Sequence, residues 1–121
     1  MIEVEQVDFI NVPTRDSARA FAWYHEVLGL PLDANNPEEL RAGQVTVSFW
    51  EPEAEGVEFK PDVGGFAVRV ADVEAAQAEL EAKGVEFLGA GDTGVCRMAV
   101  CADPDGNALI LHRRYRPYEQ S

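Results

Sequence analysis

The sequence repeats one order of elements twice, and this repeat limits the possible folds more than any other feature. In each half a strand-like stretch leads to an aspartate that suits a helix N-cap, Asp16 in the first (with Thr14 as the alternative) and Asp72 in the second. The helical pattern that follows ends at a glycine, Gly29 or Gly84, as expected at position C′. The aspartates lie 56 residues apart and the glycines 55. We therefore expect two units of the same topology, each with a strand, a helix and about three more strands.

The first unit is predicted from hydrophobic periodicity and from the residues that interrupt it. Alternation indicates a strand over Val4–Val12, which Pro13 ends because its nitrogen cannot donate to a ladder. Apolar residues at helical spacing then predict a helix over Ser17–Leu28. A short strand over Glu39–Ala42 and an alternating strand over Gln44–Trp50 complete this unit.

The second unit is predicted in the same way. Its glycine-rich stretch, Gly89–Gly94, is interpreted as a flexible turn. The other expected elements are a strand, a helix and three more strands, over Phe66–Val70, Val73–Lys83, Val85–Leu88, Cys96–Cys101 and Ala108–His112.

Length and local composition predict one domain made of two modules. A chain of 121 residues is large enough to bury a core without disulfides or metals. Residues 51–61 are rich in Glu, Pro and Gly, which is typical of an exposed linker. We therefore expect a single domain over residues 1–121, with a first module at 1–50, a linker at 51–64 and a second module at 65–115.

Charge and hydropathy exclude several classes of partner. Ten basic against 22 acidic residues give a net charge of −12, and a field of that sign repels nucleic acid but suits a cationic ligand. No apolar run approaches the roughly 18 residues of a membrane span, and the first residues show no secretory signal. We therefore expect a cytoplasmic protein with no membrane partner. Cys96 and Cys101 lie on opposite faces of one predicted strand, so two free thiols are expected.

A tight turn near the C-terminus is the most distinctive local motif. In Asp103-Pro104-Asp105-Gly106-Asn107 the proline presets φ, the glycine tolerates positive φ, and the Asp and Asn side chains bond to the local backbone. Followed by the apolar strand Ala108–His112, this motif resembles the hallmark of the vicinal oxygen chelate superfamily, which holds glyoxalase I, the extradiol dioxygenases and the bleomycin-resistance proteins. Three further stretches agree with that family in order and spacing: Val12-Pro13-Thr14-Arg15-Asp16, Leu28-Gly29-Leu30 and Val70-Ala71-Asp72.

The resemblance implies a fold of the α+β class. Members of the family contain two βαβββ modules that form a curved, partly open mixed β-sheet barrel with the helices outside. They commonly pair as homodimers, and we expect a homodimer here because the exposed sheet edges of a single unit need cover.

The resemblance also implies where metal ligands would lie. Metal-binding members carry a His, Gln or Glu on the first strand, a second such residue on the strand that opens the second half, and a Glu on the last strand. In this sequence the three positions are Phe9, Gly65 and Ile110, and none has a side-chain donor for a divalent cation. We therefore expect no metal and no other cofactor, and we assign no catalytic residue.

Alternation within the strands, combined with the family's geometry, predicts the residues that meet a ligand. One face of each sheet is part aromatic and part polar, whereas the other is apolar, as a sheet covered by helices requires. Aromatic rings on the first face would stack on flat or cationic groups, and amide, hydroxyl or guanidinium groups would orient them. The predicted ligand-binding residues are Phe9, Asn11, Ser48, Trp50, Arg69, Ile110 and His112.

Three functions stay open at this point. The favoured one is a glyoxalase/bleomycin-resistance-like protein that binds a small cationic or aromatic molecule in a concave sheet cleft, without the usual metal centre. The second is a metal-dependent enzyme, a lyase, isomerase or dioxygenase, whose metal is held by atypical donors such as Asp8, Glu51 or His112. The third is a non-catalytic dimer module with a vestigial pocket.

Overall fold

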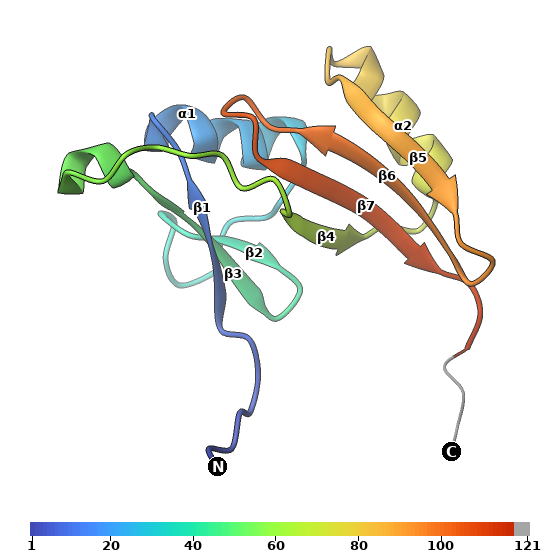
Figure 1. Cartoon of the computed structure of the whole chain (residues 1–121), viewed down its shortest axis with the longest axis horizontal. Coiled ribbons are helices and arrows are strands. Elements are labelled where there is room, and N and C mark those ends of the chain that lie inside the picture. Colours follow the sequence, from blue (N-terminus) through green and yellow to red (C-terminus); the bar gives the residue numbers. More distant parts are fainter. Residues whose placement is uncertain (118–121) are drawn as a thin grey trace. The chain divides into compact units, whose positions relative to one another are not determined.

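The computed structural model describes residues 1–117, and the chain forms two compact units, Met1–Lys60 and Pro61–Ser121. Each unit contains one open sheet, with strand order β1-β3-β2 in the first and β4-β7-β6-β5 in the second (Figure 1). Both sheets combine parallel and antiparallel pairs, and each unit adds helical segments to its sheet, so the fold is α+β. Across residues 1–117, every helix is too short or too polar to span a bilayer.

The first unit follows the predicted order, with one strand reduced to a single bridge. Leu32 and Leu40 form an isolated antiparallel bridge where a βαβββ unit has its second strand. The chain turns away directly afterwards, because the Asp33 carboxylate accepts the backbone N–H groups of Asn35 and Asn36. The elements of this unit are β1 (Phe9–Pro13), α1 (Ser17–Ala22), the π-helical turn η1 (Trp23–Val27), β2 (Leu40–Ala42), β3 (Val45–Trp50) and the 3₁₀ turn η2 (Pro52–Glu55).

The first strand is shorter than its sequence pattern predicts. Alternation predicts a strand from Val4, but pairing begins at Phe9, opposite Thr46. The partner strand β3 starts only at Val45, so the residues before Phe9 have little backbone to pair with. One bond, from the Thr46 N–H to the Asp8 carbonyl at 3.2 Å, marks the end of the pairing. The prediction for residues 4–8 is therefore wrong.

The first helix begins as predicted and changes its winding before it ends. Asp16 caps α1 by accepting a hydrogen bond from the Arg19 N–H at 3.1 Å. From Trp23 onward the backbone forms a π-helical turn, in which the Leu28 N–H reaches the Trp23 carbonyl at 3.1 Å. Gly29 then adopts a φ of +89° and ends the helix, as its position in the sequence predicts.

The helical segment covers one face of the first sheet. Tyr24, Leu40 and Val47 are each 0% exposed, and α1 packs against β3. The Tyr24 ring lies 5.1 Å from the ring of Phe49, which belongs to the same face of β3 as Val47. Because side chains alternate along a strand, this packing leaves the other residues of β1 and β3 on the face away from α1.

The second unit is a complete βαβββ unit. Asp72 caps its helix by accepting the Ala75 N–H at 3.0 Å, as the sequence predicts. The parallel pair β4–β7 and the antiparallel pairs β7–β6 and β6–β5 form its sheet. The elements are β4 (Phe66–Arg69), α2 (Val73–Ala82), β5 (Phe87–Asp92), β6 (Cys96–Ala102) and β7 (Ala108–Arg114).

The glycine-rich stretch after Phe87 is a strand and not the flexible turn expected from its composition. Gly89–Asp92 pair antiparallel with β6. The register shifts between Phe87 and Gly89, and the intervening Leu88 is 66% exposed, which is the geometry of a β-bulge. Hydrogen bonds from β6 hold this stretch extended, and composition alone gives no sign of that partner.

Helix α2 covers one face of the second sheet. It packs against β6 and β7 through Val73 and Leu80, which are 6% and 5% exposed. The strand residues beneath it are almost fully buried: Ala99, Cys101, Leu109 and Leu111. The alternate residues of β4 and β7 therefore lie on the opposite face of this sheet.

The turn between β6 and β7 also anchors the segment before β4. Asp103 accepts the backbone N–H groups of Asp105 and Asn107, both at 2.9 Å. The Asn107 side chain donates to Asp103 Oδ2 at 2.9 Å and accepts the Asp62 N–H at 2.8 Å. Asp62 in turn accepts the Gly65 N–H at 3.0 Å. One hydrogen-bond network therefore shapes the turn and sets where β4 begins.

Candidate functional site

The face of the first sheet that points away from α1 carries four of the seven predicted ligand-binding residues. Phe9 pairs in register with Thr46, and Asn11 pairs with Ser48, so their side chains share this face. Trp50 ends the same row of β3 side chains. Phe9 is 58% exposed, which leaves its ring open to stacking. The structure brings these residues onto one face, and their binding of a ligand stays a prediction.

Three of the four residues form side-chain hydrogen bonds within the unit. The Ser48 hydroxyl lies 3.4 Å from both the Ile10 carbonyl oxygen and Asn11 Oδ1, and so links β3 to β1. The Trp50 indole donates from Nε1 to Glu55 Oε2 at 3.3 Å. Trp50 is therefore oriented by η2, whereas the exposed ring of Phe9 remains the most accessible aromatic surface on this face.

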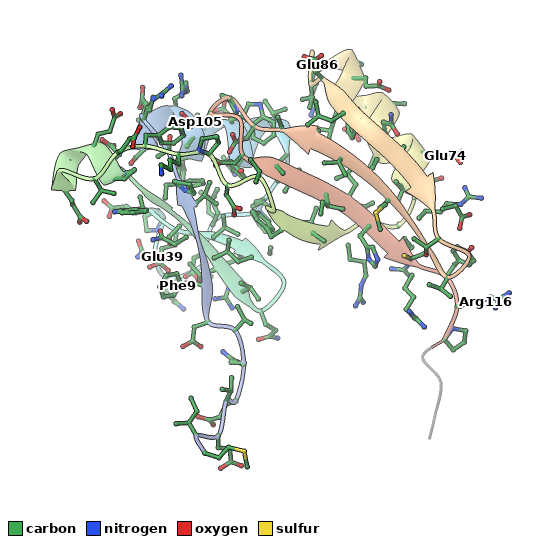
Figure 2. The ribbon with its side chains drawn as sticks, viewed as in Figure 1. Phe9, Glu39, Glu74, Glu86, Asp105 and Arg116 are labelled. Atoms are coloured by element: carbon green, nitrogen blue, oxygen red, sulfur yellow. The ribbon has the colours of Figure 1, made fainter. Side chains whose placement is uncertain are left out.

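A hollow of about 510 Å³ lies beside Phe9 and contains charges of both signs. Asp8 and Glu39 contribute carboxylates to its lining, and Figure 2 labels Phe9 and Glu39 on this unit. Arg41 contributes a guanidinium, but this group forms an ion pair with Asp33 at 3.7 Å. Because Arg41 is paired with Asp33, the hollow offers a ligand mainly carboxylates and an aromatic ring. These groups match a flat ligand group that carries positive charge.

The second sheet carries the other three predicted residues on one face. Arg69 of β4 pairs in register with His112 of β7, and Ala67 pairs with Ile110. Residues that pair in parallel strands point to the same side, so Arg69, Ile110 and His112 are neighbours. Arg69 is exposed, whereas Ile110 and His112 are half-buried. Their placement agrees with the alternation in the sequence, and their role toward a ligand stays a prediction.

A second hollow, of about 430 Å³, opens beside Arg69 and His112 and is more basic than the sequence interpretation anticipated. Arg113, Arg114 and Arg116 also line it, and Figure 2 shows Arg116 just beyond the end of β7. Among residues 1–117, none of those lining it is acidic. The sequence did not predict this basic hollow because the last strand was expected to end at His112. In the structure β7 continues to Arg114, which shares the face of His112.

The three positions at which the family places metal ligands do not fit a metal in this chain. Phe9 and Ile110 have hydrocarbon side chains. Gly65 has a φ of +64°, and a Cβ built on its backbone would lie 2.0 Å from the carbonyl oxygen of Ala108. No side chain fits at position 65 unless the backbone moves. The usual metal centre therefore has no donors at these positions.

The alternative donors have partners of their own. Glu51 accepts the Ser17 N–H at 3.1 Å, and its hydrogen bonds with Ser17 hold the pKa of the Glu51 carboxyl below its usual range. Asp8 accepts a hydrogen bond from Gln6 Nε2 at 2.9 Å. Glu51 thus serves as a partner for the N-terminus of α1. In the described part of the chain, no three His, Cys, Asp or Glu side chains lie close enough together to hold a metal ion.

Both cysteines are buried free thiols, as their odd spacing along β6 predicts. Burial, assisted by the negative charge of Asp103, raises the pKa of the Cys101 thiol to about 11. The thiolate is the reactive species, so such a thiol is a weak nucleophile near neutral pH. Cys101 therefore contributes to the core of the second unit and not to a catalytic set.

A third hollow, of about 470 Å³, lies near the start of α2 and contains an ionic network. Arg97 contacts Glu74 Oε1 at 2.7 Å and Asp92 Oδ2 at 3.6 Å. The Tyr115 hydroxyl donates to Asp92 at 2.6 Å, and this bond lowers the pKa of Asp92 and raises that of Tyr115. These charges satisfy one another and tie β5, β6, α2 and the segment after β7 together, which is a structural role.

Sequence comparison identifies the protein family to which this chain belongs. The sequence profile of the Glyoxalase/Bleomycin resistance protein/Dioxygenase superfamily matches residues 6–111. The chain therefore belongs to this superfamily, as its repeat and its C-terminal turn predict. Comparison with curated protein sequences finds no match.

Similar solved structures span nearly the whole chain. The antibiotic-binding protein TnmS3 from Streptomyces sp. CB03234 has a TM-score of 0.76 and 24% identity, covering 94% of this chain and 99% of its own. A glyoxalase/bleomycin resistance protein, also from Streptomyces sp. CB03234, has a TM-score of 0.71 and 26% identity, covering 89% and 100%. Lactoylglutathione lyase from Agrobacterium tumefaciens has a TM-score of 0.74 and 16% identity, covering 91% and 94%. The predicted glyoxalase-like fold is confirmed, but one fold serves binding proteins and enzymes alike.

Proposed function

We propose that this chain binds a small organic molecule and does not transform it. Its ligand-binding residues are those on the open faces of the two sheets, which are Phe9, Asn11, Ser48, Trp50, Arg69, Ile110 and His112. Sequestering a molecule requires affinity but no reacting groups, so the proposal needs no metal and no catalytic set. The similarity to an antibiotic-binding protein supports a drug-like compound as the ligand.

The observation that carries this proposal is the geometry at Gly65. Where an enzyme of this family would carry a metal ligand, the chain has a glycine whose missing side chain is sterically required. The hydrocarbon side chains of Phe9 and Ile110 agree with it, because neither offers a lone pair. An active site built on the family's three donor positions would therefore need a different backbone as well as different residues.

The chemistry of the first unit supports a ligand with an aromatic or cationic part. Phe9 presents an exposed ring, and the carboxylates of Asp8 and Glu39 line the same hollow. A ring over which a cation sits contributes about 0.5–2 kcal/mol, depending on how far the pair is removed from water. Asn11 and Ser48 lie on the same face and offer an amide and a hydroxyl to a polar ligand group.

The proposal includes a homodimer as the working state. β1 and β2 are the edge strands of the first sheet, and β4 and β5 are those of the second. Unpaired strand edges favour association, and a two-fold partner is the usual way to cover them. Sedimentation velocity over a range of protein concentrations tests this part: a single species of monomer mass at every concentration would refute it.

The proposed function is tested by metal analysis and ligand screening on one preparation. Protein purified without a tag or chelator is first analysed for metals by elemental mass spectrometry. We expect less than about a tenth of a metal ion per chain, since the residues at the family's three metal-ligand positions have no side-chain donor. A compound library enriched in aromatic cations and antibiotics is then screened by thermal shift, where ligands of the folded state raise Tm.

The two measurements separate the alternatives. Close to one metal ion per chain would contradict the proposal and favour a metal-dependent enzyme with atypical donors. Low metal together with a hit that saturates, and that is recovered chemically unchanged after incubation, supports a binding protein. Low metal and no hit across the library would instead favour a dimer module with a vestigial pocket.

A further inference from the structure

We infer that the second unit contains an anion-binding site, formed by Arg69, His112, Arg114 and Arg116, that takes the carboxylate or phosphate group of a small molecule. This inference rests on the proposed function and specifies one chemical feature of its ligand. It also revises an expectation from composition, because the net charge of the chain favours a cationic ligand.

Positive charge is concentrated at this place against the balance of the whole chain. The sequence contains 10 Lys and Arg residues and has a net charge of −12. Four of the arginines, together with His112, nevertheless line the single hollow of about 430 Å³. Like charges held side by side repel one another, and a bound anion removes this repulsion. The local field at this hollow, and not the average field, decides which ligand group is attracted.

Arg69 differs in its partners from Arg41 and Arg97, which also lie on strands. Arg41 and Arg97 each form an ion pair with a carboxylate. Within residues 1–117 Arg69 forms no ion pair, although acidic residues outnumber basic ones in the chain. Arg69 lines the hollow, so its planar set of N–H donors is available to a ligand there, and this set matches the paired oxygens of a carboxylate or phosphate.

Regular backbone positions these side chains. Arg69 and His112 are register partners in the parallel pair of β4 and β7, and Arg114 follows on the same face of β7. The Arg114 guanidinium donates to the Pro117 carbonyl at 3.3 Å, which keeps the segment that contains Arg116 beside the strand. Side chains carried by strands need less ordering when a ligand binds, so less affinity is lost to entropy.

The test uses two small anions on the intact chain. Inorganic phosphate and citrate are titrated separately at low ionic strength and constant pH, and binding is followed by NMR of the arginine Nε–H groups and of the β4 and β7 amides. We expect saturable shifts confined to this region. Arg69→Ala should weaken the tighter anion by at least about tenfold, the usual effect of losing a hydrogen bond to a charged group. A preference for phosphate or for citrate identifies the group that the natural ligand carries.

Two further variants separate the role of the Arg69 guanidinium from the effect of net charge. Arg69→Lys retains the charge but loses the planar guanidinium group. Its affinity for the anion should therefore lie between that of the unmodified protein and that of Arg69→Ala. Arg15→Ala makes the same change of charge in the first unit, on a side chain that is 62% exposed, and should change affinity less than about twofold. Thermal unfolding of each variant verifies that it is folded, and this is expected because Arg69 is exposed.

The outcomes separate this inference from the proposed function. Equal weakening by Arg69→Ala and Arg15→Ala would mean that the anions sense only net charge, and the site would be refuted. The absence of any shift in β4 and β7 with both anions would refute it as well. Screening hits that are neutral and insensitive to Arg69→Ala would keep the binding function and remove the anion site. Anion binding without any hit from the library would support the site and leave the proposed function without support.

Discussion

The Asn107 side-chain oxygen accepts the Asp62 backbone N–H at 2.8 Å, across 45 residues of sequence. The same amide donates to the Asp103 carboxylate at 2.9 Å, and Asn107 is only 2% exposed. The motif by which the family is recognised is therefore a structural joint in this chain. It holds the turn before β7 against the segment that leads into β4, and so determines how the parallel strands β4 and β7 of the second sheet are placed. It identifies the fold without identifying a reaction.

Replacing Asn107 by alanine tests this joint. Asn107→Ala leaves the buried Asp103 carboxylate and the Asp62 N–H each without one partner, so we expect a loss of about 2–3 kcal/mol in the free energy of unfolding. Urea unfolding measures it. Asn35→Ala is the matched control, since Asn35 is exposed and only its backbone N–H is bonded, and it should cost less than about 0.5 kcal/mol. Equal losses in both variants would contradict the role of the joint.

Adding one methyl group at Gly65 should be far more damaging than adding it elsewhere in the same sheet. A Cβ at position 65 meets the Ala108 carbonyl oxygen at 2.0 Å and the residue has a φ of +64°, so Gly65→Ala should cost about 3 kcal/mol or more. At Gly89 nothing lies within 4 Å of the added carbon, and Gly89→Ala should be neutral or stabilise by up to about 1 kcal/mol. The comparison is made by urea unfolding, and a Gly65→Ala protein as stable as the parent would disprove the packing described.

The raised pKa of Cys101 predicts slow chemistry at this thiol. With a pKa of about 11 in place of the ordinary 9.0, its thiolate fraction at pH 8 is lowered about a hundredfold. Alkylation by iodoacetamide, followed by mass spectrometry of each peptide, should be at least that much slower in the native protein than in urea. Because the folded-state pKa is raised, the stability that the neutral thiol contributes is complete below pH 9.0 and is lost as the pH rises toward about 11. Native labelling at the unfolded rate would contradict both statements.

Tyr115→Phe should change how Asp92 titrates. The Tyr115 hydroxyl bond is the main cause of the lowered pKa of Asp92, so this pKa should rise when the hydroxyl is removed. Since the folded-state pKa of Asp92 is lowered, its stabilising effect is present above its ordinary value and is lost as the pH falls through the folded value. Carbon-detected NMR of the Asp92 carboxyl measures the shift, and Asp92→Asn removes the signal as a control. An unchanged titration in Tyr115→Phe would assign the shift to another cause.

Phe9→Ala tests the ligand-binding face of the first sheet. The ring is 58% exposed, so its loss should leave Tm nearly unchanged, while the affinity for aromatic hits from the screen should fall about fivefold or more. Leu88→Ala removes an equally exposed apolar side chain, at 66%, from the bulge of β5, and should not affect binding. A ligand whose Kd is the same in all three proteins binds elsewhere, and Phe9 would then lose its place in the proposed site.

The features that local sequence determines were predictable. Asp16 and Asp72 were expected to cap helices and do so, because an aspartate before an apolar periodic stretch bonds to the N–H groups of the first turn. The grouping of Arg69 with His112 followed from simple alternation once the order of the strands was implied by the family. Such features depend on a few neighbouring residues and therefore leave a readable pattern.

The features that depend on a distant partner were not predictable. Residues 4–8 alternate like a strand, but β3 begins too late to pair with them. Gly89–Asp92 resemble a turn, but β6 pairs with them. The basic hollow was missed because His112 was taken as the end of its strand, and only pairing with β6, which reaches Arg114, shows that β7 continues. In each case pairing with another strand decides whether the segment is part of a sheet. Local composition does not show whether such a partner strand is present.

The close approach of Gly65 to Ala108 bears on how a chain of this kind evolves. A position that merely lacks a metal ligand can regain one by a single codon change, but this position cannot, because any side chain there collides with the backbone of β7. Restoring a donor would require a compensating shift of a central strand before the new residue conferred any advantage, and each intermediate would be less stable than its parent. A metal ligand at position 65 is therefore hard to regain, and under the proposed function selection would act on the residues that contact the ligand.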